Sequence, residues 1–559
     1  MYVVATAGHV DHGKSTLVQR LTGMWPDRLA EEQRRGLTID LGFAWTAIEG
    51  REIAFVDVPG HERFVGNMLA GVGPVPAVLF VVAATEGWMP QSEEHVAALR
   101  ALGVGHTLVV ISKADLADPT PALAQCREQF PGAPVVLGTD LDQVRRSLVA
   151  LVDGLPAPDS DADVRLWVDR SFTVRGSGTV VTGTLAAGRI SVGDELDHDG
   201  RTVSVRGLQS LGRDQPSVAA VARVAVNLRG VDRDAIRRGD TLCTPGAWLP
   251  TGEVDVALRE QGKLQQRLVL HLGSAAVPVH VRPLGETGAR LRLARPLPLR
   301  VGDVGLLRDP GEHRIAAGVQ VLDVRPAPLR RRGEARARAA EIATGRVAPP
   351  VCERADTLRA MGFAASGDRI GDWVVAPGWW AQRRRDAVSA VERWVADHDI
   401  AAGMPVETLR RQAGLPAPQL VAPLLDGTGL TVRDGLVQRP GTDLPPRVDA
   451  AVRAVTEWLA SDPFRAPEAA ELAALGLGPK EIGAAVRAGR LARIADGVVL
   501  GPDVHARAAE VLAALPQPFT VAEAKRALDT TRRVAVPLLE QLDARCITRR
   551  AGDGTRRLV

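Results

Sequence analysis

The stretch Gly8-His9-Val10-Asp11-His12-Gly13-Lys14-Ser15 decides the fold of the N-terminal part of this chain. It fits the pattern G-x-x-x-x-G-K-[ST], in which glycines let the backbone turn so that its N–H groups face phosphate oxygens. The apolar run Tyr2 to Ala7 before it is typical of a strand, and Thr16 to Leu21 after it is typical of a helix. A phosphate-binding loop between a strand and a helix predicts an α/β nucleotide-binding domain.

Several polar residues have the spacing of a site for nucleoside triphosphate hydrolysis. Lys14 would place its charge on the β- and γ-phosphates, and the Ser15 hydroxyl would ligate Mg²⁺. Asp57 follows the apolar strand Ile53 to Val56 and is a second candidate ligand for Mg²⁺. Thr38, in the polar stretch Arg35 to Asp40, is a third, whose hydroxyl is expected to reach Mg²⁺ only in the GTP state.

The phrase Asp57-Val58-Pro59-Gly60-His61 adds the catalytic residue. Gly60 would let its backbone N–H approach the γ-phosphate. His61 is then placed to orient the attacking water, a role that glutamine fills in some other GTPases. We therefore predict that His61 is the catalytic residue of a GTPase.

The choice of base rests on Ser112-Lys113-Ala114-Asp115, which follows the buried strand Leu108 to Ile111. This phrase resembles the N-K-x-D guanine motif of GTPases, with serine in place of the asparagine. Asp115 would accept hydrogen bonds that adenine cannot supply, and Lys113 would cover the base. The usual S-A-x motif is missing after Pro134 to Leu137, so the contact to the guanine O6 is left open. The predicted nucleotide-binding residues are Gly8, His9, Val10, Asp11, His12, Gly13, Lys14, Ser15, Thr16, Asp57, Gly60, Ser112, Lys113 and Asp115.

Composition and length indicate a soluble multidomain protein. The chain has 559 residues, 45% hydrophobic and 24% charged, with a net charge of only +3. Its four cysteines show no metal or disulfide spacing, and no stretch is long and apolar enough to cross a bilayer. The first residues read as a strand rather than a signal peptide. A cytoplasmic protein without a membrane partner is therefore expected.

Two regions after the nucleotide domain have the pattern of small antiparallel barrels. Residues 164–245 contain short alternating strands with turn phrases such as Val192-Gly193-Asp194 and Arg238-Gly239-Asp240, and residues 250–325 repeat this character. The arginine-rich region Pro326 to Ala340 is expected to join these barrels to the rest of the chain.

The remaining residues contain a repeat of about 60 residues. Helical segments precede short turn phrases at Gly371-Asp372, Asp434-Gly435, Asp496-Gly497 and Asp553-Gly554. Each phrase is typical of a hairpin between two short strands, so we predict four tandem α+β winged-helix modules. In the last one, residues 517–559 carry nine lysine or arginine residues against five acidic residues. Such a basic module favours RNA binding, because arginines track phosphates and stack on exposed bases.

Taken together, these features resemble the bacterial selenocysteine-specific elongation factors, a branch of the translational GTPases. The most specific phrases are Gly36 to Phe43, Asp169-Arg170-Ser171-Phe172 and Phe519 to Val559. The resemblance implies a GTP-binding domain at 1–160, barrels at 161–248 and 249–328, and winged helices at 329–378, 379–441, 442–502 and 503–559. It also implies a ribosome-stimulated, monomeric GTPase with GTP and Mg²⁺ as cofactors. This GTPase would deliver selenocysteinyl-tRNA to the ribosome at UGA codons marked by a selenoprotein mRNA hairpin, and GTP hydrolysis would release the tRNA.

The resemblance also assigns two binding sites outside the nucleotide domain. Asp169, Arg170 and Arg223 match the pocket for the selenocysteinyl group, where guanidinium groups would favour an ionised selenol over neutral analogues. The C-terminal module would hold the hairpin through Arg532, Arg533, Arg549, Arg550 and Arg556.

Two other classes of function compete with this one. A general initiation factor or a sulfate-activation GTPase subunit would share the nucleotide domain, but neither explains four terminal winged helices. A DNA-binding regulator with a GTPase sensor would use winged helices, but the paired barrels argue against it. Binding of an RNA hairpin rather than duplex DNA would separate the first hypothesis from the last.

Overall fold

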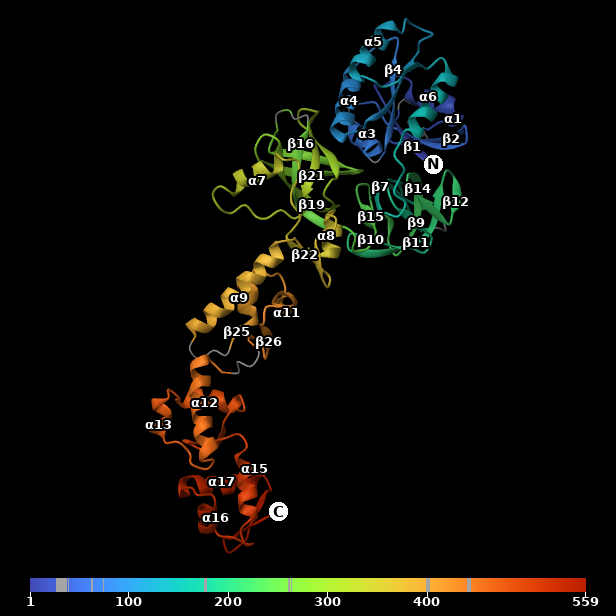
Figure 1. The fold of residues 1–559 in the computed structure, drawn as a ribbon. Helices are drawn as coiled ribbons and strands as arrows, with labels where there is room; N and C mark the ends of the chain where they lie inside the picture. The colour runs from blue at the N-terminus through green and yellow to red at the C-terminus, as the bar shows by residue number, and fades with distance from the viewer. Residues whose placement is uncertain are drawn as a thin grey trace. The chain divides into compact units, whose positions relative to one another are not determined.

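The computed structural model describes residues 1–26, 38, 40–61, 64–73, 75–174, 178–259, 262, 264–398, 403–439 and 444–559. Most of the Arg35-to-Asp40 stretch lies outside these residues. The described chain forms two compact units, one of residues 1–350 with 354–365 and one of residues 351–353 with 366–559 (Figure 1). Among the described residues, no helix has the length and apolar character that a membrane crossing requires.

The first unit begins with a six-stranded sheet. Its strands, in order across the sheet, are β2 (Gly42–Ile48), β3 (Arg51–Asp57), β1 (Tyr2–Ala7), β4 (Ala77–Ala83), β5 (His106–Ser112) and β6 (Val135–Leu137). All neighbours are parallel except β2 and β3. Apolar side chains of α1 (Lys14–Thr22) and α6 (Leu141–Asp153) cover one face. Those of α3 (Val65–Val72), α4 (Pro90–Leu102) and α5 (Thr120–Gln129) cover the other. This is the expected α/β domain, and its near-continuous apolar strands fit a sheet buried on both faces.

A seven-stranded antiparallel sheet follows and closes through an additional pairing of β10 with β11. Across the sheet its strands are β10 (Glu195–His198), β15 (Thr241–Cys243), β7 (Arg165–Val174), β8 (Gly178–Leu185), β14 (Ala222–Arg229), β11 (Arg201–Ser210) and β12 (Arg213–Gln215). A small sheet pairs β9 (Arg189–Ser191) with β13 (Ser217–Ala219). The first barrel predicted from alternation is therefore present.

The second barrel is closed by six strands. In order they are β16 (Leu249–Arg259), β19 (Gly288–Leu299), β18 (Ala275–Pro283), β17 (Arg267–Leu272), β20 (Val304–Asp309) and β21 (Arg314–Asp323). The three Gly-Asp turn phrases of the two barrels have one geometry. Gly193, Gly239 and Gly302 all have φ near +90°, which favours glycine, and the carboxylate after each accepts the backbone N–H three residues before it.

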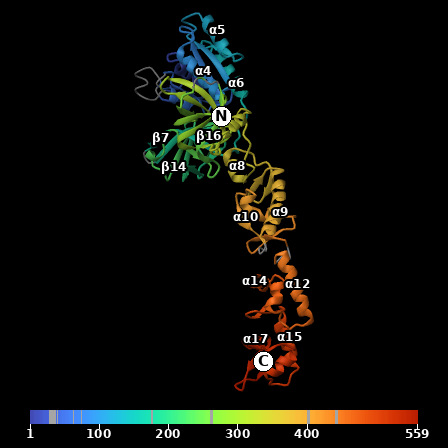
Figure 2. The same cartoon turned by 90° about the vertical axis from the view of Figure 1, so that its left-hand side faces the viewer.

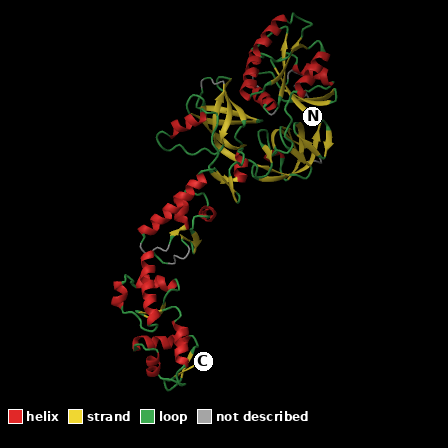
Figure 3. Ribbon diagram, in the orientation of Figure 1, coloured by secondary structure: helices red, strands yellow, loops and turns green. Residues whose placement is uncertain are grey.

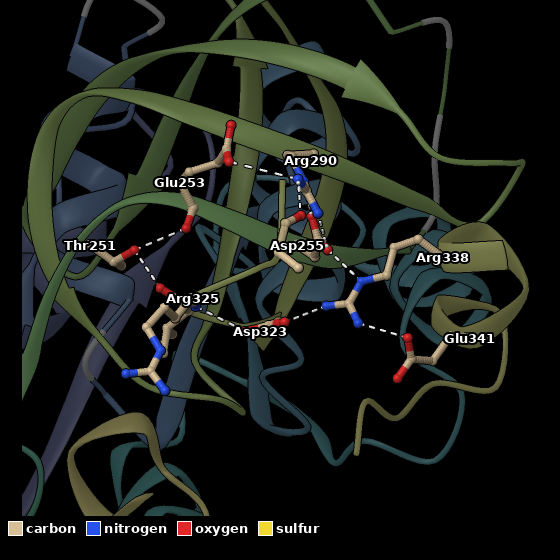
Figure 4. A network of polar contacts seen from close by, with 10 residues as sticks. Thr251, Glu253, Asp255, Arg290, Asp323, Arg325, Arg338 and Glu341 are labelled. Carbon is tan, nitrogen blue, oxygen red and sulfur yellow. Dashed lines mark hydrogen bonds and ion pairs between the residues drawn. The ribbon is translucent and has the colours of Figure 1, made fainter. Parts of the chain in front are cut away.

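The segment after the second barrel packs on it. Ile342, at the end of α7 (Glu334–Ile342), is buried against Leu284 and Leu322. Arg338 of α7 donates to Asp255, Asp323 and Glu341, and Asp255 also accepts two hydrogen bonds from Arg290 (Figure 4). Asp255 is fully buried and Arg290 nearly so, so this network holds α7 on the barrel.

This packing divides the first predicted winged helix, residues 329–378. Helices α7 and α8 (Ala355–Met361) belong to the first unit. Only a three-stranded sheet, in the order β22 (Cys352–Arg354), β24 (Trp373–Val375) and β23 (Asp368–Ile370), leads into the second. The cause is the apolar face of α7, which is buried against the barrel rather than in a module of its own. The other domain limits remain predictions.

The second unit consists of helices and short hairpins (Figure 3). One module holds α9 (Trp379–Asp397), α10 (Val406–Gln412), α11 (Val421–Leu425), β25 (Met404–Pro405), β26 (Thr431–Arg433) and β27 (Leu436–Gln438). The next holds α12 (Pro446–Ser461), α13 (Ala469–Ala474), α14 (Pro479–Arg487), β28 (Ala492–Ala495) and β29 (Val498–Leu500). The last holds α15 (Val504–Ala513), α16 (Val521–Ala527), α17 (Arg532–Ala544), β30 (Thr548–Arg550) and β31 (Arg556–Leu558), with α15 and α17 side by side in both views (Figures 1 and 2).

All four turn phrases join the short antiparallel strands predicted for them. At Asp434-Gly435 both residues have positive φ, as the favoured two-residue hairpin turn requires. One apolar core runs through the last two modules, whereas α9, α10 and α11 share a separate core.

Candidate nucleotide, aminoacyl and RNA sites

The phosphate-binding loop has the geometry predicted for it. Gly8 has φ +125°, and a Cβ there would collide with the carbonyl oxygen of Val81. Gly13 has φ +80° and immediately precedes α1, so the loop leads directly to a helix N-terminus. The Lys14 ammonium lies inside the loop and donates to the carbonyl oxygens of Gly8 and His9 at 3.1 and 2.7 Å. Val10 and Asp11 form its outer turn, and Thr16 is exposed on the first turn of α1.

The three candidate magnesium ligands come together beside this loop. The Ser15 hydroxyl donates to Asp57 Oδ2 at 2.6 Å and lies 3.1 Å from the Thr38 hydroxyl. Thr6, which the sequence analysis missed, fixes the other carboxylate oxygen, because its hydroxyl donates to Asp57 Oδ1 at 2.6 Å. Two hydroxyls and a carboxylate form the hard oxygen donor set that Mg²⁺ prefers, so these residues fit that ion.

Gly60 and His61 follow Asp57 at the edge of the site. A Cβ on Gly60 would collide with Lys14 and the loop backbone, so only glycine permits this approach. The His61 ring is half-buried, with its centroid 6.0 Å from that of Phe64. His61 therefore directly follows the glycine that approaches Lys14 and the loop backbone.

Three histidines lie close together, His9 and His12 in the loop itself and His95 beside it. His9 and His12 have ring centroids 5.1 Å apart, and His95, on α4, accepts a hydrogen bond from the Gly8 N–H at 2.9 Å. Burial lowers the pKa of all three, to about 4 for His12 and about 3 for His95. The rings are therefore neutral at pH 7 and do not compete with Lys14 for phosphate. No local motif marks His95, because its partner lies far away in the sequence.

The guanine motif is joined to the phosphate-binding loop by its unusual serine. The Ser112 hydroxyl donates to the His12 carbonyl at 2.6 Å, so this short side chain ties β5 to the loop. The Lys113 ammonium contacts Glu86 at 3.2 Å, and Asp115 is exposed in the turn that follows. Gly138 donates its N–H to the Ile111 carbonyl at 2.8 Å, which places the Gly138-Thr139-Asp140 turn next to this motif.

The structure also gathers the residues predicted for the selenocysteinyl pocket. Asp169 and Arg170 lie on β7 and Arg223 on β14, and the guanidinium carbons of both arginines lie over the Phe43 ring, at 5.2 and 4.1 Å from its centroid. Asp169 is 4% exposed and pairs with Arg223, not with its neighbour Arg170. Asp169 also accepts from Thr182 at 2.7 Å.

Arg170 instead faces the nucleotide domain. Its Nε donates to Asp40 Oδ2 at 3.0 Å, and its Nη2 donates to the Leu41 carbonyl. Arg238, which the sequence analysis treated only as part of a turn, donates to Asp40 Oδ1 at 3.2 Å and to Asn67 at 2.7 Å. An arginine next to a Gly-Asp turn was the only trace of this contact in the sequence.

The C-terminal basic residues fall into two groups. Arg532 and Arg533 at the start of α17, and Arg549 and Arg550 on β30, are exposed. Arg556, which was also predicted to contact RNA, differs from these four: its side chain is 5% exposed and pairs with Asp543 at 2.8 Å. Strand alternation turns Arg556 inward and Arg557 outward, so Arg557, opposite Arg549, takes its place on the exposed face.

Comparison with known proteins agrees with this organisation. Residues 1–131 match the elongation factor Tu GTP binding domain, residues 178–243 match elongation factor Tu domain 2, and residues 510–557 match the winged helix of elongation factor SelB. A crystal structure of a bacterial selenocysteine-specific elongation factor, EF-Sec, superimposes with a TM-score of 0.74. It is 24% identical in sequence, and the match covers 100% of this chain and 99% of that one. At this identity the match supports the fold.

Two curated relatives are also named selenocysteine-specific elongation factor. The selenocysteine-specific elongation factor of Escherichia coli (strain K12) is 38% identical over 58% of this chain, and the match spans only 56% of that protein. The selenocysteine-specific elongation factor of Haemophilus influenzae is 30% identical over 75% of this chain and 74% of its own length. Because this second match covers most of both proteins, the chain belongs to the family of selenocysteine-specific elongation factors.

Proposed function

We propose that this protein is a ribosome-stimulated GTPase that delivers selenocysteinyl-tRNA to UGA codons marked by an mRNA hairpin. It would act as a monomer in the cytoplasm, and GTP hydrolysis would release the tRNA. The observation that carries this proposal is the pair of guanidinium groups over Phe43, on the barrel next to the nucleotide domain. A nucleotide site alone would fit many other factors, whereas this cationic pocket is suited to an anionic side chain.

The nucleotide domain would bind and hydrolyse GTP. Backbone N–H groups of the loop and Lys14 would bind the phosphates, and Asp115 would select guanine. Ser15, Thr38 and Asp57 would hold Mg²⁺, which neutralises charge on the phosphates. His61 would orient the attacking water. The neutral histidines in and beside the loop leave Lys14 as the cation nearest the phosphates.

The barrel would recognise the aminoacyl group by charge. A selenol is more acidic than a thiol, so at neutral pH it is largely ionised, whereas the serine hydroxyl is neutral. Arg170 and Arg223 would stabilise the selenolate, and Asp169 would hold Arg223 in place. The exposed arginines of the last module would hold the RNA hairpin through its phosphates and unstacked bases.

The experiment that tests this proposal compares binding of the GTP-loaded protein to selenocysteinyl-tRNA and to the same tRNA carrying serine. We expect a strong preference for the selenocysteinyl form. Equal binding of the two tRNAs, or no binding, would contradict the proposed delivery of selenocysteinyl-tRNA. It would not affect the assignment of the nucleotide site.

A further inference from the structure

Asp40 bridges two arginines of the first barrel. Each carboxylate oxygen holds one of them: Oδ2 accepts from Arg170 and Oδ1 from Arg238. The three side chains are 25–31% exposed, so their charges are only partly screened by water. Arg238 also donates to Asn67 on α3, and this second hydrogen bond orients the Arg238 guanidinium toward Asp40.

Arg170 and Arg223 both belong to the predicted pocket, but their counter-ions come from different domains. Arg223 is neutralised within the barrel by the buried carboxylate of Asp169. Arg170 is neutralised by Asp40, which lies between Thr38 and β2 of the nucleotide domain. Of the two pocket arginines, Arg170 is therefore the one whose neutralisation depends on the position of the nucleotide domain.

We propose that Asp40 is a built-in competitor for the aminoacyl group, an inference that rests on the proposed function. A carboxylate and a selenolate are both anions that a guanidinium binds, so Arg170 cannot serve both fully at once. With Asp40 where the structure places it, the pocket is partly neutralised and its affinity for a selenolate is reduced. A serine hydroxyl carries no charge, so Asp40 has little effect on its binding.

The position of Asp40 links this competition to the nucleotide. Two residues before it, the Thr38 hydroxyl lies 3.1 Å from Ser15 in the candidate magnesium site. In this arrangement Thr38 reaches the candidate magnesium site, as expected for the GTP state, while Asp40 holds Arg170. Asp40 therefore competes for Arg170 in the arrangement that is expected to bind the tRNA, and it lowers the affinity that the pocket would otherwise have for a selenolate.

The test uses the full chain with the substitution Asp40→Asn, which keeps the shape and removes the charge. Dissociation constants for selenocysteinyl-tRNA and seryl-tRNA are measured with GDP and with a non-hydrolysable GTP analogue. With the GTP analogue, we expect Asp40→Asn to bind selenocysteinyl-tRNA about fivefold more tightly than the unmodified protein, the scale of one partly exposed ion pair. Binding of seryl-tRNA should change less than about twofold.

Glu94→Gln is the matched control, since it breaks another ion pair between the nucleotide domain and a barrel, to Arg308, away from the pocket. It should leave both tRNA affinities unchanged. An unchanged affinity of Asp40→Asn for selenocysteinyl-tRNA, or an equal gain for seryl-tRNA, overturns the competitor role. If the unmodified GTP form itself shows no preference for selenocysteinyl-tRNA, the failure lies with the proposed function instead.

Discussion

His95 Nδ1 accepts a hydrogen bond from the backbone N–H of Gly8 at 2.9 Å, and this bond ties α4 to the first residue of the phosphate-binding loop. A ring nitrogen accepts a hydrogen bond only when it carries no proton. Complete burial keeps the ring neutral by lowering its pKa to about 3. The loop is therefore held by a group that is unprotonated in the folded protein and protonated below pH 6.5 in the unfolded chain.

The first prediction concerns the pH dependence of stability. Because the folded pKa of His95 lies below its unfolded value of 6.5, the unfolded state binds more protons as the pH falls. The contribution of His95 to the free energy of unfolding is therefore complete above pH 6.5. As the pH falls from 6.5 toward the folded pKa, this contribution decreases by up to about 1.4 kcal/mol per pH unit. His95→Gln keeps an acceptor that does not titrate. Calorimetry should therefore show a smaller loss of Tm for the nucleotide domain between pH 7 and pH 5 in this variant.

His106→Gln is the control, because His106 is exposed at the start of β5. It should leave the pH dependence as in the unmodified protein. An equal loss of Tm in His95→Gln and His106→Gln would show that the buried ring does not titrate on unfolding.

A second prediction follows from the hydrogen bond between Ser112 and the His12 carbonyl. Ser112→Ala removes the 2.6 Å link between the guanine motif and the phosphate-binding loop. A lost hydrogen bond of this kind costs about 1 kcal/mol, so GTP and GDP should each bind about fivefold more weakly. Thr120→Ala, which loses a hydroxyl bonded only locally to Asp118, should bind both nucleotides normally in the same titration. Identical constants for Ser112→Ala and Thr120→Ala would contradict this role.

The third prediction concerns His61. Replacement by alanine should leave GTP affinity intact, because the predicted role of the ring is to contact the attacking water and not the nucleotide. It should abolish ribosome-stimulated hydrolysis, because the group predicted to orient the attacking water is removed. Single-turnover hydrolysis on ribosomes measures this directly. A normal rate in His61→Ala would refute the catalytic assignment.

The parts of the fold that were predictable from sequence are those that depend on neighbouring residues. The phosphate-binding loop, Asp57 at a strand end and the Asp434-Gly435 hairpin each depend on a few adjacent residues. Contacts between distant segments leave no such pattern. Asp169 pairs with Arg223 across the sheet rather than with Arg170, and His95 reaches Gly8 from another helix.

Burial was also difficult to predict where a charge was involved. The sequence predicts one exposed group of C-terminal arginines, but strand alternation buries Arg556 against Asp543. Likewise, Arg338 lies in a region that appeared to be a simple joint. Its partners Asp255 and Asp323 come from two barrel strands, and only the closed barrel brings them together.

The fourth prediction tests that network. Arg338→Met removes one of the two arginine partners of the fully buried carboxylate of Asp255 and leaves Arg290 as the other (Figure 4). The loss of one charged hydrogen-bond partner costs about 2 kcal/mol, so thermal unfolding of the first unit should begin at a lower temperature. Arg336→Met changes an exposed arginine on the same helix and should have no such effect. Equal melting curves for Arg338→Met and Arg336→Met would mean that α7 is held by its apolar contacts alone.

The last prediction separates RNA contact from structural support in the C-terminal module. Arg549 and Arg550 are exposed on β30, so their replacement by alanine together should weaken binding of the cognate mRNA hairpin and reduce its salt dependence. Nucleotide affinity and the melting of the module should stay unchanged. Arg556 is buried against Asp543, which is itself partly exposed, so Arg556→Met should instead destabilise the module by about 1–3 kcal/mol.

Hairpin affinity, its salt slope and circular-dichroism melting of the full chain together distinguish these outcomes. Loss of affinity with an unchanged melting curve marks a residue that contacts RNA, because removal of an exposed charge does not disturb packing. Loss of RNA affinity together with a lower melting temperature marks a residue that supports the β30–β31 hairpin from inside the module. If Arg549→Ala with Arg550→Ala leaves affinity unchanged, recognition must lie elsewhere in the module, and the exposed Arg532 and Arg533 at the start of α17 become the next residues to replace.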